Sequence, residues 1–146
     1  SFDSLDLGVF KNLTQIGNNF LENSSIQTAD LTKITNLKTI GSNFLKDCHN
    51  IDTIDFSNNT SITDVNYDGL LQNTYSLNSV NVSNLTPISN TTALSTNSKE
   101  QTCYTRGIEL LGTNKETWKT TFTNSDKYPY YRNLILKPNS LTIEGS

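Results

Sequence analysis

The chain has 146 residues, which suits a single domain, and 34% of them are hydrophobic. Its net charge of −3 and pI near 5.0 argue against a nucleic-acid partner, which would select a basic face. No apolar run reaches membrane-spanning length and no signal peptide is visible, while Asn, Ser and Thr form about two-fifths of the residues, which favours short strands, turns and polar loops.

The first segment has the pattern of a short strand. Phe2, Leu5 and Leu7 match the strand part of a repeat, and the Leu-x-Leu alternation places both leucines on one face, with Asp6 between them on the other. Nothing before Phe2 could cover this first turn of chain, and the sequence contains no Met and begins at Ser1. Because repeat arrays normally cap their ends, we expect an N-terminally incomplete array whose natural start lies further upstream.

Apolar residues then recur in columns with a step of about 24 to 25 residues, from Leu13 to Leu37 to Ile62, which is typical of leucine-rich solenoids. The best-kept copy contains Leu37, Ile40, Gly41, Phe44, Cys48, Ile51, Ile54 and Phe56, and we expect Phe44, Ile54 and Phe56 to be buried. Gly17, Gly41 and Asn66 share one column, which predicts a left-handed turn there. The apolar pair that follows each of them predicts a single helical or 3-10 turn in each return segment.

These columns resemble the BspA-like type of leucine-rich repeat, which is common on microbial surface proteins. Ile16-Gly17 with Phe20, and Ile40-Gly41 with Phe44 and Cys48, carry the resemblance, which covers residues 1–112. The chain departs from the family at Asn19 and Asn43, where Ala is usual, and the third repeat lacks the Gly and the Phe. The expected fold is an α/β solenoid, namely a short right-handed leucine-rich repeat with a parallel sheet of about four or five strands, short helical or 3-10 return segments and a C-terminal helix cap.

Beyond the third repeat the period lengthens, and the polar run Ser89–Thr102 is expected to be a surface loop. Ile108–Leu110 supplies the last strand of the array. Thr113 and Glu116 fit a capping box that starts a helix over about 114–122, in which Trp118 and Phe122 share one face.

Residues 113–132 are therefore expected to cap the open end of the array. In 133–146, two apolar segments, Leu134–Leu136 and Leu141–Ile143, flank Lys-Pro-Asn-Ser. They predict either a terminal hairpin or the start of a following module.

The residues that could carry chemistry do not form a catalytic or metal-binding set. His49 is the single histidine and has no orienting partner or nucleophile turn in the sequence. Two cysteines and one histidine at these separations do not make a zinc site. Cys48 and Cys103 lie about two turns apart, near or beyond the bridging limit, so we expect Cys48 to be a small buried apolar residue instead. We expect no enzyme activity, no cofactor and no metal.

One polar column is a candidate binding surface. The residues between the two apolar strand positions are expected to form a row on an exposed concave sheet face: Asp6, Asp30, Asp55, Asn81 and Glu109. They either keep the sheet soluble or form an acidic docking stripe for a basic partner or a cation. A possible aromatic patch of Tyr128, Tyr130 and Tyr131 either binds a partner or packs over the end of the array.

The sequence therefore predicts a non-enzymatic protein-binding or adhesion module of a secreted or cell-surface microbial protein, which binds through its concave sheet. The expected partner is a protein, either basic or on a host surface, and the isolated domain is expected to be a monomer. Two alternatives stay open: a structural spacer without a ligand, and an accessory domain of a larger surface hydrolase.

Overall fold

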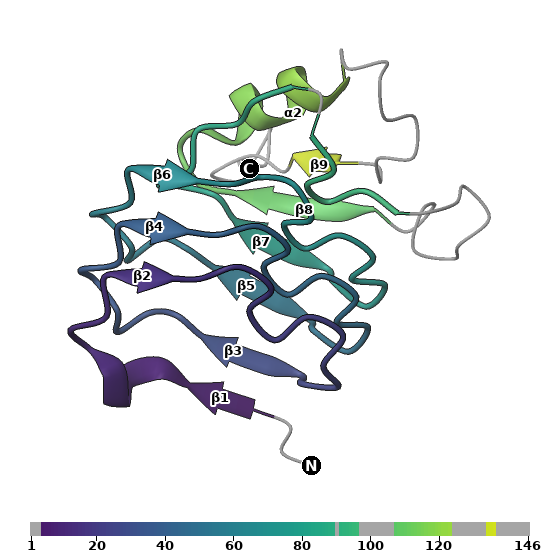
Figure 1. Cartoon of the computed structure of the whole chain (residues 1–146). Helices are drawn as coiled ribbons and strands as arrows, with labels where there is room; N and C mark the ends of the chain where they lie inside the picture. The colour runs from purple at the N-terminus through teal and green to yellow at the C-terminus, as the bar shows by residue number, and fades with distance from the viewer. Residues whose placement is uncertain (1–3, 90, 97–106, 124–133, 137–146) are drawn as a thin grey trace, which may run out of the picture.

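The computed structural model describes residues 4–89, 91–96, 107–123 and 134–136 and shows a parallel-strand solenoid of about four turns with little helix. The main sheet runs up one side of the stack (Figure 1). Its hydrogen-bonded parts are β1-β3 and β5-β7-β8-β9, and β3 lies beside β5. The strands are β1 (Ser4–Asp6), β3 (Thr28–Asp30), β5 (Thr53–Asp55), β7 (Ser79–Asn81), β8 (Ile108–Leu111) and β9 (Leu134–Leu136).

A second, smaller parallel sheet was not expected from the sequence. It lies on another side of the same turns and consists of β2 (Gln15–Ile16), β4 (Thr39–Ile40) and β6 (Asp64–Val65) (Figure 1). Ile16 pairs with Ile40, and Ile40 pairs with Val65. The repeated Ile-Gly columns therefore mark strands as well as turns.

The expected core residues are confirmed. Phe44 and Phe56 are fully buried and Ile54 is 2% exposed. The Phe44 ring stacks on Phe20 of the previous turn with centroids 5.6 Å apart, and it lies 5.9 Å from the Phe56 ring. Stacked aromatic rings thus bridge successive turns inside the solenoid.

Asparagine side chains also join successive turns. Fully buried Asn59 donates from Nδ2 to the carbonyl oxygens of Leu31 (3.0 Å) and Ile34 (3.1 Å) in the turn before it. Asn84 and Asn114 make the same paired contact one and two turns later, to the carbonyl oxygens of Phe56, Ser57, Val82 and Leu85. These bonds join the backbone of successive turns through side-chain donors.

The helical or 3-10 turns predicted after Gly17, Gly41 and Asn66 are not helical in the structure. The single 3-10 helix in the described residues, η1, spans Leu7–Phe10. The later returns instead contain left-handed residues at alternate positions, as at Asn19 (φ 64°), Leu21 (φ 51°) and Asn23 (φ 61°). Because of this alternation, the N–H groups of successive left-handed residues point alternately to the next and to the previous turn of the solenoid. Asn19 N, for example, donates to Ser42 O in the next turn (2.8 Å).

The predicted left-handed column was also misplaced. Gly17, Gly41 and Asn66 are absent from the positive-φ residues, which begin two residues later at Asn19 and Asn43. Gly41 is needed for close approach instead, since a Cβ there would lie 2.7 Å from the backbone nitrogen of Asn18. The asparagines that depart from the usual Ala are well suited to left-handed backbone, and Asn43 Nδ2 donates to Asn19 Oδ1 (2.8 Å).

The fourth turn differs from the others. Eleven residues separate Ile34 from Leu45 and twelve separate Asn59 from Leu71, but nine separate Leu85 from Leu94, which donates to Leu70 O (2.9 Å). The short segment contains Pro87, which lacks an N–H, and its described residues between Leu85 and Leu94 form no strand. The second sheet therefore ends at β6.

The prediction of a surface loop over Ser89–Thr102 is wrong for residues 91–96, although Ser89 is exposed. Thr91 and the segment 93–96 are buried, with Ala93 fully buried and Leu94 1% exposed. These residues form the return of the fourth turn and pack inside the array. Residues 97–102 of the expected loop lie outside the described part.

Helix α2 (Lys115–Thr123) confirms the helix expected over 114–122. Trp118 is fully buried, its Nε1 donates to Leu85 O (3.1 Å), and its ring lies 5.2 Å from Phe122. Leu134–Leu136 joins the main sheet as β9, parallel to β8. Tyr128, Tyr130, Tyr131, Cys103 and the segment 141–143 lie outside the described residues, and the domain boundaries and the right-handed winding stay predictions.

Candidate functional site: two exposed faces

Four members of the predicted polar row end successive strands of the main sheet. Asp6 pairs directly with Asp30, and Asp55 pairs directly with Asn81. Because β3 lies beside β5, these residues follow one line across the sheet at the strand spacing of about 4.8 Å. Asp6 and Asp55 are exposed, whereas Asp30 and Asn81 are partly exposed.

Glu109 does not continue this row. The register places Glu109 opposite Ser79, and the position opposite Asn81 is taken by Leu111, which is 38% exposed. Glu109 lies on the same strand face but two residues nearer the start of the strand. The repeat columns placed Ile108 and Leu110 two residues out of register, because they aligned Ile108 with Val80, whereas Val80 pairs with Leu110.

Each residue of the row closes a local turn. Asp30 Oδ1 accepts hydrogen bonds from the backbone N–H (2.9 Å) and the hydroxyl (2.6 Å) of Thr32. The same i to i+2 bond recurs along the row: Asp6 Oδ1 accepts from Gly8 N (2.8 Å), Asp55 Oδ1 from Ser57 N (2.8 Å) and Asn81 Oδ1 from Ser83 N (3.1 Å). These are Asx turns, in which a side chain imitates the backbone at the exit from a strand.

The sequence contains a signal for these turns that strand alternation alone does not reveal. An Asp or Asn is followed two residues later by Gly, Thr or Ser in all four copies. Asn81 shows that an amide oxygen can hold the turn as a carboxylate does. The turn therefore requires the acceptor oxygen, whereas the negative charge is an additional property of three of the four positions.

Charge along the row is only partly compensated. Lys33 Nζ lies 3.4 Å from Asp6 Oδ2, and both side chains are more than half exposed, so the pair contributes about 0–1 kcal/mol. Hydrogen bonding to Thr32 holds the pKa of Asp30 below its ordinary value, with a smaller contribution from the charge of Lys33. Among the described residues, Oδ2 of Asp30 and of Asp55 accepts no hydrogen bond, so both oxygens can receive a partner's donor.

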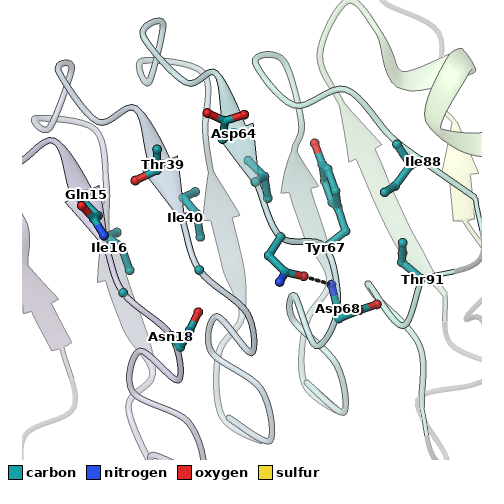
Figure 2. A pocket seen from close by; sticks show the side chains of 14 residues that line it. Gln15, Ile16, Asn18, Thr39, Ile40, Asp64, Tyr67, Asp68, Ile88 and Thr91 are labelled. Carbon is teal, nitrogen blue, oxygen red and sulfur yellow. Dashed lines mark hydrogen bonds between the residues drawn. The ribbon is translucent and has the colours of Figure 1, made fainter.

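A groove of about 610 Å³ lies on the second sheet (Figure 2). Strand residues form one part of it, and Ile88 and Thr91 of the short fourth turn stand at the other end, with Tyr67 between. Two carboxylates, Asp64 and Asp68, belong to its lining, which contains no Lys, Arg or His. The lining residues are Gln15, Ile16, Gly17, Asn18, Thr39, Ile40, Gly41, Asp64, Val65, Asn66, Tyr67, Asp68, Ile88 and Thr91.

Tyr67 fills the interior where the second sheet stops. Its side chain is 6% exposed, and its ring meets Trp118 edge-on at 6.0 Å. Burial raises the pKa of Tyr67 to about 12, while hydrogen bonding to the backbone of Thr86 acts in the opposite direction. Ile88, in contrast, is 51% exposed, so an apolar side chain faces the groove.

The described residues contain no group of three or more His, Cys, Asp or Glu side chains that could hold a metal ion. Cys48 is a buried free thiol whose Sγ donates to Leu21 O (3.0 Å), and burial raises its pKa, which disfavours the reactive thiolate. His49 stacks on Tyr75 with ring centroids 4.6 Å apart. Within the described part of the chain, no helix is long and apolar enough to cross a membrane.

Comparison with known proteins identifies the repeat. The family model described as BspA type Leucine rich repeat region (6 copies) matches residues 3–100, which is about two-thirds of the chain. No curated protein and no solved structure matches the chain. Leucine-rich repeat modules of other proteins commonly bind proteins.

Proposed function

Because this chain belongs to the BspA-type leucine-rich repeat family, we propose that it is a non-enzymatic protein-binding module of a secreted or cell-surface microbial protein. It binds a basic segment of its partner through the outer face of the main sheet. The observation that carries this proposal is the row of carboxylates at Asp6, Asp30 and Asp55, each held in place by a turn that it closes.

The geometry favours charged recognition in two ways. The Asx turns fix Oδ1 of each carboxylate, so little side-chain entropy is lost when a partner's ammonium or guanidinium group reaches Oδ2. Carboxylates repeated at about 4.8 Å also create a negative field that raises the encounter rate with basic surfaces. This attraction is screened by salt, because the row is exposed to solvent.

A spacer function is the second candidate, and the same turns favour it. If the row only closes turns at the strand exits, its residues have a complete structural role without any ligand. The array would then hold neighbouring domains apart. The two candidates differ in one respect, which is whether the charge, as distinct from the acceptor oxygen, is required.

The test separates charge from turn closure. Asp30→Asn with Asp55→Asn removes two charges and retains the acceptor oxygens, as Asn81 does in the wild-type chain. The matched control is Glu22→Gln with Glu116→Gln, which removes two charges at a partly exposed and an exposed residue that belong neither to the row nor to the groove. Binding of a fluorescent deca-lysine peptide and of immobilised matrix proteins is measured for each variant at low and at high salt.

We expect the row variant to weaken binding about tenfold or more at low salt, while the control retains most of the wild-type affinity. The difference between the variants should shrink at high salt. Equal binding by the row variant and the wild type would reject the docking function and favour the spacer.

We further propose that α2 closes the C-terminal end of the array, which winds in a right-handed sense. Support comes from buried Trp118, from its bond to Leu85 O, and from the packing of α2 against β8 and β9. Such a cap covers apolar surface that the last turn would otherwise expose. The isolated domain is accordingly proposed to be a monomer.

A further inference from the structure

The second sheet ends inside the array rather than at one of its ends. In the described residues β6 pairs with β4 alone, although the main sheet continues past the same level through β7, β8 and β9. The next turn is two or three residues shorter between its anchoring contacts and contains Pro87. An edge strand is therefore left beside the groove.

The free edge of β6 offers backbone hydrogen bonds. Asp64 N donates to Lys38 O (3.2 Å) and Asn66 N donates to Ile40 O (2.9 Å), so both point toward β4. Neighbouring residues in a strand direct their N–H and C=O groups to opposite sides. Val65, which lies between them, thus directs its N–H and C=O away from β4, where the described chain supplies no strand.

A second cavity lies on this free side. It has a volume of about 230 Å³ and separates β6 from the segment that contains Asn84, Thr86 and Ile88. Four of its lining residues also line the 610 Å³ groove: Asp64, Val65, Tyr67 and Ile88. The two spaces therefore meet at the edge of β6.

The chemistry of the lining selects a kind of occupant. Asp64 and Asp68 are exposed, and neither cavity is lined by a Lys, Arg or His that would neutralise them. Half-exposed Ile88 supplies an apolar contact on the far side of the edge. Backbone donors and acceptors, one apolar wall and two carboxylates together suit an extended peptide with a basic side chain.

We propose that this groove is a second binding site, in which an extended segment of a partner protein pairs with β6 as an added strand. A Lys or Arg of that segment lies against one of the two carboxylates, Asp64 or Asp68, and a neighbouring apolar side chain packs on Ile88. Recognition of this type gains affinity from main-chain bonds and specificity from the side-chain contacts. The site is independent of the acidic row, which lies on the main sheet.

The probe is a fluorescein-labelled octapeptide of alternating Thr and Val with one central Arg, whose binding to the whole chain is followed by fluorescence anisotropy. Two matched peptides separate the contributions. One is N-methylated at every backbone nitrogen, which removes the N–H donors of both strand edges and leaves the charge. The other replaces the Arg with Gln, which removes the charge and leaves the backbone. The protein variants are Asp64→Asn with Asp68→Asn, and Asp30→Asn with Asp55→Asn.

The expected result has three parts. The Arg peptide binds, the N-methylated peptide loses at least about tenfold in affinity, and the Gln peptide loses less. The Asp64→Asn, Asp68→Asn variant binds the Arg peptide about as weakly as the wild type binds the Gln peptide. The Asp30→Asn, Asp55→Asn variant loses less affinity for the Arg peptide than the Asp64→Asn, Asp68→Asn variant does, which keeps this test separate from that of the acidic row.

Three outcomes would overturn the proposal: no binding of the Arg peptide, equal binding of its N-methylated form, or loss of binding only when the acidic row is changed. Hydrogen exchange localises the contact independently, because the bound peptide should slow exchange of the Val65 amide. Self-association of the wild-type protein through β6 would also overturn it, since the occupant would then be a second copy.

Discussion

The two sheets of this protein are built from the same turns of chain, yet they end differently. The main sheet continues to β9, whereas the second sheet stops at β6, although the stack itself goes on. Above β6 the turns remain joined by Asn84 and Asn114 and by the bond from Leu94 N to Leu70 O. A solenoid can therefore lose a strand on one side without losing its stacking, provided that other columns continue.

The two sheets end differently because the turns contribute different lengths of chain to the two sides of the solenoid. On the main sheet, an Asx turn closes the exit from each of four strands and keeps the register. On the second sheet the strands have two residues each. The return segment of the fourth turn is too short to form another strand beside β6. The exposed polar row and the open edge are consequences of these two arrangements.

The largest effect on the protein is expected from a deletion that removes helix α2 together with the last strand of the main sheet. Deleting residues 113–146 removes β9 and Trp118, so β8 becomes an unpaired edge and Leu85 loses its indole contact. We expect association or aggregation, measured by gel filtration with light scattering. A soluble monomer with an unchanged unfolding midpoint would reject the proposed cap.

The second-largest effect, a loss of folding stability, is expected from truncating an aromatic side chain in the core that both sheets share. Phe44→Ala should lower the free energy of unfolding by about 3–5 kcal/mol, because the ring is fully buried and stacks on Phe20. Phe20→Ala should cost less, since Phe20 is only partly buried. Urea denaturation of both variants measures the difference, and a loss well under 1 kcal/mol for Phe44→Ala would contradict the proposed packing.

The burial of these aromatic residues could be predicted from the sequence, because identical columns recur over several turns. The second sheet could not, since strands of two residues have no alternation that separates them from turns. Asn19 and Asn43 look like departures from the family, yet they suit left-handed backbone whose N–H groups reach the next turn. Glu109 was displaced because the repeat columns aligned Ile108 with Val80, whereas Val80 pairs with the residue two positions later.

The candidate sites were predictable to different degrees. Asp6, Asp30, Asp55 and Asn81 follow from strand alternation, whereas their turn-closing bonds depend on the residue two positions later. The groove depends on the length of one return segment relative to its neighbours. That quantity becomes visible only when three-dimensional contacts show that Leu94 corresponds to Leu71 and Leu45.

A loss of folding stability of intermediate size is expected at alkaline pH, because the buried Tyr67, which follows β6 in the chain, titrates there. Its folded pKa is raised to about 12, against about 10 in the unfolded chain, so the contribution to stability is complete below pH 10. Between about pH 10 and 12 the unfolded state releases the proton first, and stability should fall by roughly 2–3 kcal/mol. Tyr67→Phe should remove this part of the pH dependence in urea denaturation; an unchanged profile would contradict the assignment.

A smaller effect separates turn closure from charge on the main sheet. Asp30→Ala removes both bonds to Thr32 and should cost about 1 kcal/mol, whereas Asp30→Asn should change stability by less than about 0.5 kcal/mol. The lowered pKa of Asp30 means that its contribution is present above pH 3.8 and is lost as the pH falls through the folded pKa. Thermal unfolding of the two variants measures this, and equal losses would show that the turn does not depend on the acceptor oxygen.

Hydrogen exchange at two neighbouring amides tests most directly whether the second sheet ends at β6. Asn66 N donates to Ile40 O at 2.9 Å, whereas the Val65 N–H points to the opposite side, where the described residues supply no partner strand. Measured by NMR on the whole chain, the Asn66 amide should exchange slowly and the Val65 amide should exchange close to the rate of an open peptide. Equal protection of both amides would contradict the open edge and, with it, the second binding site.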